Sequence, residues 1–326
     1  LATVFKASKL NLYLDIKQQF MKRRNFLSAV ATTGLATSVF PNTNFMKLSS
    51  KSNLKISLAQ WSLNKSIRSG NLPILDFAKK ARSFDIEGIE FVSGLYTRHT
   101  DTMEGMSMNS LSKELIKRSN DYGVENVLFM IDGQGDLASS NETDRLQAIE
   151  NHKRWIDFSA EIGCKTMRVN LNGEKDLDKW TENSVKSLTN LNEYNKKMNV
   201  VVENHGGLSS SGKYLSNVMD QVKLKNCGTL PDFGNFCMNG SPWGNCRKMY
   251  DRYLGTEELM RYAHAVSAKS FDFDDEGNET QIDYKRMMDI VKKAKYKGYV
   301  GIEYEGNRLS EDDGIIATKK LLEKYI

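Results

Sequence analysis

The feature that most constrains this chain is the alternation of short apolar runs with helical patterns from Leu54 to the C-terminus. Eight runs have the length and the composition of β-strands. They are Ile56–Ala59, Gly88–Val92, Asn126–Ile131, Thr166–Asn170, Val200–Glu203, Gly228–Asp232, Ala265–Phe271 and Tyr299–Tyr304. Strands that alternate with helical segments indicate βαβ units and a parallel sheet.

The segments between these runs carry the period of amphipathic helices. Apolar side chains fall at i, i+3, i+4 and i+7 in two clear stripes: Ile74, Phe77, Ala78 and Ala81, and then Tyr284, Met287, Met288 and Val291. A stripe of this spacing can cover one face of a sheet. Glycines precede several runs, at Gly123, Gly163, Gly228 and Gly298, where this residue can end a helix.

Eight strand and helix units predict a closed (β/α)8 TIM barrel in a single domain over residues 53–326. The length fits, because such a barrel takes about 250 residues. Neither a GxGxxG loop nor a GxxxxGK(S/T) loop follows the first run, so dinucleotide-binding and P-loop folds have no support.

Residues 21–52 are predicted to be an export signal and leader. Met21 is followed by the basic triplet KRR and then by an apolar, small-residue stretch from Leu27 to about Val39, too short to span a bilayer. The paired arginines before Phe-Leu are typical of a twin-arginine signal. We therefore expect the twin-arginine machinery to deliver a soluble periplasmic or otherwise exported protein without a stable membrane anchor. An ordinary export signal and a membrane anchor are the alternatives. Residues 1–20 are interpreted as an upstream extension.

The charge and the cysteine content argue against a nucleic-acid partner and against a zinc knuckle. The net charge is +5, and charges alternate in sign along the predicted helices, so no nucleic-acid partner is expected. The four cysteines include no CxxC pair, which argues against a zinc knuckle. Cys237 and Cys246 could pair across a loop in an exported protein, but we expect unpaired thiols, the commoner state.

Carboxylates end three of the predicted strands. Glu203, Asp232 and Glu303 close runs five, six and eight. The C-terminal strand ends of a barrel meet at one mouth, and a carboxylate buried there alone is costly. Converging carboxylates need a cation or a proton between them, and hard oxygen ligands favour Mn²⁺ or Mg²⁺. A salt-bridged strand end is the alternative interpretation of each acid.

Four phrases, VVENHGG, LPDFGNF, VSAKSFDFD and GYVGIEYEG, resemble in order and spacing the metal-site strands of the sugar isomerase/epimerase family of xylose-isomerase-like TIM barrels. Residues 152–170 resemble the helix and fourth strand of that family. The resemblance covers the chain from Ile56 onward. It implies that Glu203, Asp232 and Glu303 bind Mn²⁺ or Mg²⁺, with Co²⁺ or Zn²⁺ as alternatives. It also implies that Glu203 and Glu303 form the catalytic acid/base pair.

The sequence departs from the family at two positions. Ser267 stands where the family has a histidine ligand, in a phrase like V-H-x-K, and Asn235 stands where some relatives carry another histidine. A serine hydroxyl is a poor metal ligand, so the occupancy of the metal site is left open.

Other residues are candidates for the mouth of the barrel. His205 shares strand parity with Glu203, so it can act there as a metal ligand, an acid/base group or a substrate contact. Lys269 can reach a substrate oxygen or pair with a barrel acid. Further substrate-binding candidates are Arg168 and Asn170 at the end of the fourth run, and Trp61 and Trp243 in loops, where core packing is the alternative for both tryptophans.

Together with these residues, the resemblance implies an isomerase or epimerase that acts by metal-assisted proton transfer next to a carbonyl of a sugar or polyol-type substrate. One alternative is a lyase on oxidised glycosides, which begins with the same removal of an α-proton. The other is a non-catalytic carbohydrate-binding barrel with a degenerate metal site, which Ser267 motivates. The particular sugar and the oligomeric state do not follow from the sequence.

Overall fold

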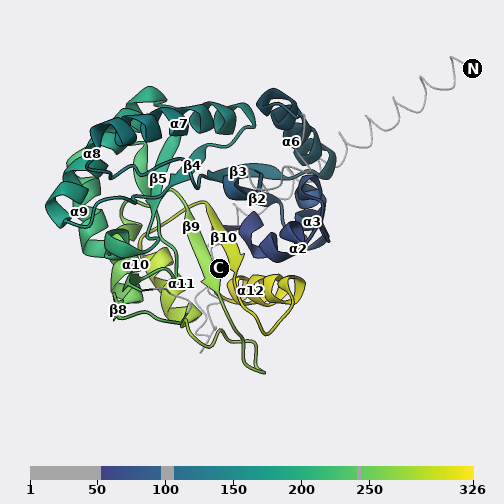
Figure 1. Cartoon of the computed structure of the whole chain (residues 1–326). Helices are drawn as coiled ribbons and strands as arrows, with labels where there is room; N and C mark the ends of the chain where they lie inside the picture. The colour runs from purple at the N-terminus through teal and green to yellow at the C-terminus, as the bar shows by residue number, and fades with distance from the viewer. Residues whose placement is uncertain (1–52, 97–105, 241–243) are drawn as a thin grey trace, which may run out of the picture. The chain divides into compact units, whose positions relative to one another are not determined.

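The computed structural model describes residues 53–96, 106–240 and 244–326, so the predicted export signal, the upstream extension and Trp243 lie outside the described residues. Eight strands form the central wall (Figure 1). They are β1 Lys55–Ala59, β2 Gly88–Val92, β3 Glu125–Met130, β4 Thr166–Val169, β5 Asn199–Glu203, β6 Cys227–Leu230, β9 Val266–Ser270 and β10 Tyr299–Tyr304. Each coincides with a predicted run, with ends that differ by at most two residues.

The strands are parallel and lie in the order β6-β5-β4-β3-β2-β1-β10-β9. The wall closes between β6 and β9, where the structure has isolated parallel bridges, Asp232 with Ser267 and Thr229 with Ala263. The amide of Phe233 donates to the Ser267 carbonyl at 3.1 Å, and the Ser267 amide donates to Pro231 at 3.0 Å. The predicted TIM barrel is therefore confirmed, and its closing seam runs through two residues of the predicted site.

Helices surround the strands (Figure 1). They are α2 Asn64–Arg68, α3 Phe77–Ser83, α4 Ser93–Tyr96, α6 Met108–Tyr122, α7 Glu142–Glu161, α8 Leu177–Tyr194, α9 Gly212–Val222, α10 Arg252–Met260, α11 Tyr284–Lys293 and α12 Glu311–Tyr325. Short 3-10 turns are η1 Gln60–Leu63, η2 Ile74–Asp76 and η3 Gly207–Ser210, and a hairpin pairs β7 Cys237–Asn239 with β8 Lys248–Met249. Both predicted apolar stripes are buried, as helices packed on a sheet require.

Local signals in the sequence set the helix ends. Seven helices begin after a side chain that accepts a hydrogen bond from a first-turn amide: Ser107, Asn141, Asp176, Ser211, Asp251, Asp283 and Ser310. Gly123 ends α6 with φ 62°. The interpretation of Gly228 as a helix end is wrong, because it lies inside β6. A Cβ there would collide with the His264 ring, so close packing explains this glycine.

An aromatic cluster fills the space between the sheet and its helices on one side of the barrel. Phe91 of β2 stacks on Phe129 of β3 with ring centroids 5.5 Å apart, and Phe129 contacts Trp155 and Phe158 of α7 at 5.3 and 5.6 Å. These four residues are called the aromatic cluster below. They anchor α7 to the β2–β3 face.

A disulfide joins Cys237 of β7 to Cys246, with Cα atoms 5.7 Å apart. The expectation of unpaired thiols is wrong for this pair, because the antiparallel pairing of β7 with β8 brings the two ends of the loop together. Cys164 and Cys227 are free and buried. None of the helices in the described ranges has both the length and the apolar character needed to cross a bilayer.

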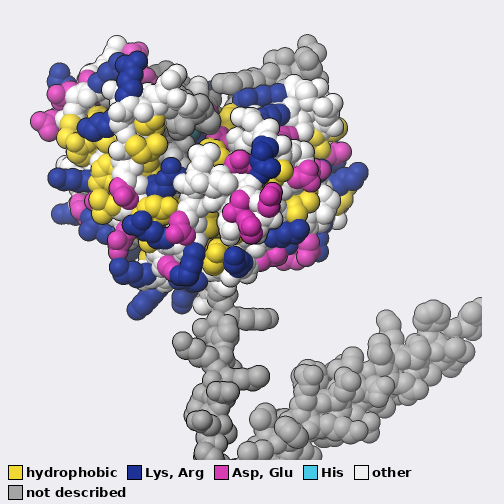
Figure 2. Space-filling model, turned by 90° about the horizontal axis from the view of Figure 1, so that it is seen from below, with side chains coloured by type: hydrophobic (Ala, Val, Ile, Leu, Met, Phe, Trp, Pro, Cys, Tyr) yellow, Lys and Arg dark blue, Asp and Glu magenta, His cyan; other side chains and the backbone are white. Residues whose placement is uncertain are grey.

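The surface carries charges of both signs. On the face in Figure 2, Lys and Arg side chains are interspersed with Asp and Glu. Exposed ion pairs also form within single helices, such as Lys117–Asp121 in α6 and Lys186–Glu182 in α8, each with 2.6 Å or less between nitrogen and oxygen. Water screens such exposed pairs, which therefore contribute little to stability and do not determine the fold.

Candidate active site

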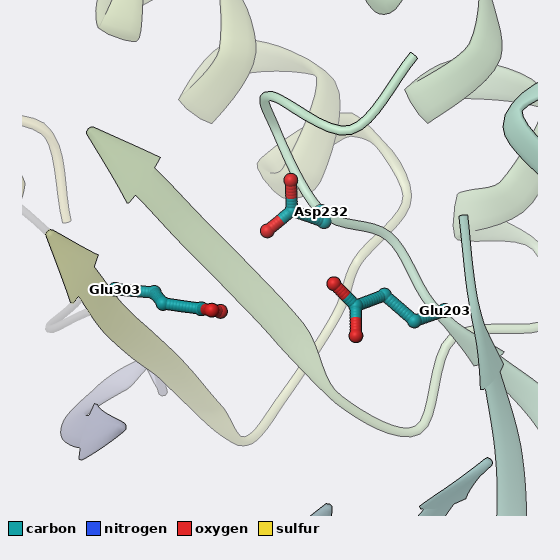
Figure 3. Close-up of side chains that lie close together, drawn as sticks. All are labelled: Glu203, Asp232 and Glu303. Atoms are coloured by element: carbon teal, nitrogen blue, oxygen red, sulfur yellow. The ribbon is translucent and has the colours of Figure 1, made fainter. Parts of the chain in front are cut away.

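Three carboxylates converge at the mouth of the barrel. Glu203 ends β5, Asp232 follows β6, and Glu303 lies in β10; one ligand oxygen from each lies within 4.8 Å of the others. Figure 3 shows the three side chains directed toward a common space. All are buried, with Asp232 at 0% exposure. The acids lie together, as the sequence predicts, because the C-terminal ends of parallel strands meet at the same rim. They are called the triad below.

Two buried cations flank the triad. Lys269 of β9 is 1% exposed, and its Nζ lies 2.9 Å from Glu303 Oε1, 3.3 Å from Glu305 Oε2 and 3.7 Å from Asp232 Oδ2. On the other side, Arg168 of β4 places Nε 2.8 Å from Glu203 Oε2. The negative charge of the triad is therefore partly balanced by the protein itself.

Ser267 faces the triad from β9. Its hydroxyl lies 2.6 Å from Asp232 Oδ2 and 2.9 Å from Glu303 Oε2, so its single proton can be donated to either acid. Asn235 donates its side-chain amide to Glu203 Oε1 at 3.0 Å. The two positions at which the sequence departs from the resemblance thus hold short polar groups that hydrogen-bond the carboxylates.

A loop after β6 fixes Asp232. Its Oδ1 accepts hydrogen bonds from the amides of Gly234 and Asn235, each at 2.8 Å. Asn204, the residue after β5, accepts from the Asp232 amide at 2.8 Å and donates to the Asp232 carbonyl at 3.0 Å. These bonds hold one oxygen of Asp232 in place and leave Oδ2 directed toward Ser267 and Lys269.

Burial and pairing push the acid pKa values apart. Burial raises the pKa of Glu203 to about 7, although Arg168 opposes this, and burial raises the pKa of Asp232 to about 7, although Lys269 opposes it. For Glu303, burial acts in the same direction, but Lys269 and Ser267 outweigh it and lower the pKa. The triad therefore holds protons near neutral pH that a bound cation can displace.

A pocket of about 210 Å³ opens beside the triad. The polar or aromatic residues in its wall are Trp61, Asp132, Arg168, His205, Glu303 and Glu305. Burial lowers the pKa of His205, so its imidazole is neutral and can donate or accept a hydrogen bond. Trp61 donates Nε1 to Glu305, and the Arg68 guanidinium lies 4.7 Å from the Trp61 ring centroid.

The remaining candidates take different places. His205 lies in the pocket wall and outside the group of carboxylates within metal-binding distance. Lys269 is enclosed by acids, which corresponds to the ion-pair alternative for this residue. Arg168 lines the pocket, whereas Asn170 donates its amide to Asp132 Oδ1 at 3.1 Å.

Three acids near the site were not among the sequence candidates. Asp132 follows β3, pairs with Arg168 at 2.7 Å and lines the pocket. It directly follows the third predicted run, so a search for acids at the ends of all eight runs would have found it. Glu305 lies two residues after Glu303, hence on the same strand parity. Glu90 is 2% exposed in β2 and accepts a hydrogen bond from Ser57 at 2.5 Å. Burial raises the pKa of Glu90 to about 8.

The triad fits a divalent cation. Oxygens bound to one ion lie about 2–2.6 Å from it, so ligand atoms already within 4.8 Å of each other need only small adjustments to share an ion. The donor set consists of three carboxylates, which suits hard cations such as Mn²⁺ and Mg²⁺ and does not exclude Zn²⁺.

The sequence profile of the xylose isomerase-like TIM barrel family matches residues 78–325. The chain belongs to this family. A search of curated proteins finds no match. Among solved structures, a D-tagatose 3-epimerase-like protein is similar with TM-score 0.60, 19% identity, and coverage of 83% of this chain and 96% of the other.

Two further structures of the same fold are informative. A 3-keto-D-glucoside 4-epimerase from E. coli has TM-score 0.58 and 13% identity, with 84% of this chain and 100% of that chain covered. An IolI protein with a bound zinc atom has TM-score 0.61 and 12% identity, with 83% and 99% covered. At such identities the likeness concerns the fold. The structural neighbours of this chain thus include sugar epimerases or isomerases and a probable 3-DHS dehydratase, and one neighbour holds a zinc atom.

Proposed function

We propose that this protein is a sugar isomerase or epimerase that transfers a proton next to a carbonyl, assisted by a divalent metal at Glu203, Asp232 and Glu303. The observation that carries the proposal is the convergence of three buried carboxylates beside a pocket with polar walls. Buried acids at this density are costly for folding, and the ability to bind a cation and move a proton accounts for them.

Glu203 and Glu303 are the proposed acid/base pair. One carboxylate oxygen takes the proton from the carbon next to the carbonyl, and the other carboxyl group returns a proton to the neighbouring carbon or the opposite face. In the metal-free protein Lys269 keeps Glu303 ionised, while the pKa of Glu203 is about 7, so the two carboxyl groups differ in their affinity for a proton. Such divergent environments are typical of acid/base partners. A bound divalent cation supplies stabilisation of negative charge on the substrate oxygens.

The pocket wall would position the sugar. Arg168 and neutral His205 supply hydrogen-bond donors, and Asp132 supplies acceptors, which together match the hydroxyl groups of a polyol. Asp232 is proposed as a metal ligand only, because its Oδ1 is already committed to two backbone amides.

The test is exchange of a substrate α-proton in D2O, followed by NMR over a panel of ketoses and aldoses with added Mn²⁺. Glu203→Gln and Glu303→Gln should each lower the exchange rate by about 10²-fold or more, the usual contribution of a general acid or base. The matched control is Glu182→Gln, an exposed acid of α8, which should exchange as the wild type does. Undiminished exchange in both site variants would contradict the assignment.

One observation favours the second candidate, a non-catalytic carbohydrate-binding barrel. Lys269 already places an ammonium 2.9 Å from Glu303, and Ser267 replaces a stronger ligand, so the triad is balanced in part without metal. This candidate predicts that sugar raises the melting temperature by mass action while no α-proton exchanges. A lyase on oxidised glycosides would show exchange together with release of the leaving group.

We also propose export by the twin-arginine route, from residues 21–52. The Cys237–Cys246 disulfide supports this proposal, because disulfides persist in oxidising compartments. Replacing Arg23 and Arg24 by Lys should retain the protein in the cytoplasm, as measured by cell fractionation. Unchanged export of that variant would exclude the route.

A further inference from the structure

A second pocket adjoins the first at the mouth of the barrel. It has a volume of about 450 Å³, against about 210 Å³ for the pocket beside the triad. The side chains that carry the argument are Phe271, Asp272, Gln281, Glu305, Asn307 and Arg308. Glu305 lines both pockets, so its side chain lies at the boundary that the two pockets share.

Glu305 is held in place between the two pockets. Its carboxylate lies 3.3 Å from Lys269 Nζ and accepts a hydrogen bond from Trp61 Nε1, so it is tied to the ends of β9 and β1, the two strands that flank β10. Its side chain is 8% exposed. A carboxylate fixed in this way presents its acceptors at the boundary of the two spaces without rearrangement, as preorganised binding sites do.

The wall of the second pocket has the composition of a carbohydrate site. Phe271 provides an aromatic surface, and Gln281, Asn307 and Asp272 provide planar groups that can donate to or accept from neighbouring hydroxyls. Lys65 Nζ donates to Asn307 Oδ1 at 2.9 Å and to the Gly306 carbonyl at 2.8 Å, which fixes this segment.

The second pocket is also coupled structurally to the triad. A Cβ at Gly234 would lie 2.9 Å from Phe271 Cζ and 2.7 Å from Lys269 Cγ, so Gly234 permits both side chains to pack on the loop that fixes Asp232. The aromatic wall therefore has a set position relative to the triad.

The charges disfavour a phosphorylated ligand. Arg308 Nε lies 2.6 Å from Asp272 Oδ1, and Arg168 is paired with Glu203 and Asp132, so both arginines of the two pocket walls are neutralised. Glu303 and Glu305 add negative charge. A phosphate dianion would meet carboxylates there, whereas a neutral sugar would find donors and acceptors.

Resting on the proposed function, we propose that the second pocket is a carbohydrate subsite and that the substrate is a neutral disaccharide or glycoside. One unit would occupy the pocket beside the triad, and the unit linked to it would occupy the pocket of Phe271 and Asn307. This assigns a specific role to Glu305, which lies where the linkage between the units would pass.

Binding is tested separately from chemistry, by titration calorimetry of the full chain with glucose, galactose, cellobiose, maltose, lactose and glucose 6-phosphate. At least one disaccharide should bind tenfold or more tightly than its monosaccharide, and glucose 6-phosphate should bind no tighter than glucose. Equal affinity of all disaccharides and monosaccharides, or no disaccharide binding, overturns the subsite. Tenfold tighter binding of the phosphate overturns the assignment to neutral sugars.

Two variants locate the subsite. Asn307→Leu and Gln281→Leu should each weaken binding of the preferred disaccharide at least fivefold and leave the monosaccharide unchanged; both lie at the surface of the fold, and their melting temperatures serve as a check. The control is Asn109→Leu on the exposed side of α6. Equal loss for both ligands overturns the proposal. Tighter disaccharide binding without α-proton exchange leaves the subsite standing and contradicts only the proposed reaction.

Discussion

The aromatic cluster and the triad are buried to similar extents, but the chemical surroundings of their side chains are opposite. Phe129 of the aromatic cluster is 0% exposed and is surrounded by rings, whereas Lys269, which flanks the triad, is 1% exposed and is surrounded by carboxylates. The aromatic cluster lies between the sheet and α7, whereas the triad lies at the mouth of the barrel. Burial alone therefore does not separate residues that stabilise the fold from residues that make the site.

The difference lies in what each region needs from its surroundings. The aromatic cluster stabilises the fold because apolar surface is removed from water, and this contribution does not depend on ions. The triad is stable only while protons, Lys269, Arg168 or a bound cation balance its charge. The two regions should accordingly respond differently to substitution, to metal and to pH.

The largest effect is expected in the aromatic cluster. Phe129→Ala removes a ring that contacts Phe91, Trp155 and Phe158, and should lower the free energy of unfolding by about 3–5 kcal/mol. Urea denaturation measures this loss. Mn²⁺ should shift the midpoint of the variant and of the wild type by the same amount; a selective rescue by Mn²⁺ would contradict the separation of the two regions.

Lys269→Met should come next. It removes the ammonium between Glu303, Glu305 and Asp232 and should cost about 3 kcal/mol in EDTA, the lower end for a broken buried ion pair. The lower end is expected because Asp232 and Glu203 can take up protons near pH 7. Here Mn²⁺ should restore part of the stability, in contrast to Phe129→Ala. Absence of any metal effect would argue against a cation site.

Glu90 should make the free energy of unfolding depend on pH. Its pKa is about 8 in the folded protein and about 4.5 in the unfolded chain, so the folded state keeps a proton that the unfolded state loses between these values. The contribution of Glu90 is full below pH 4.5 and is lost as the pH rises toward 8. Glu90→Gln should therefore gain stability relative to the wild type from pH 5 to pH 8, by at least about 1.4 kcal/mol. Exposed Glu182→Gln is the control, and a constant difference would contradict the prediction.

The smallest effect concerns Ser267. Since its hydroxyl contacts both Asp232 and Glu303, Ser267→His should place an imidazole at the triad and tighten Mn²⁺ binding at least tenfold, about 1.4 kcal/mol. Titration calorimetry measures the change. Asp232→Asn in the Ser267→His background should remove most of the gain. Unchanged affinity would mean that the imidazole does not reach the ion.

The strands and the triad were predictable because period and parity are local properties. Runs such as Gly88–Val92 and Tyr299–Tyr304 match their strands residue for residue, and parallel strand ends must share a rim. What could not be predicted depends on distances between segments. The Cys237–Cys246 bond follows from the β7–β8 pairing, and the enclosure of Lys269 by Asp232 and Glu305 follows from side-chain placement across three strand ends.

The closing seam of the barrel lies beside the triad, so a ligand bound at the triad can affect how firmly the barrel is closed. Between β6 and β9 the wall is joined by isolated bridges at Asp232–Ser267 and Thr229–Ala263. Neighbouring strands elsewhere form ladders of at least three paired positions, with one register shift between β2 and β3. A cation or a sugar that contacts both Asp232, after β6, and Glu303, in β10, would connect the two sides of this seam. Ligand binding would then restrain local opening at this seam, which is joined by isolated bridges.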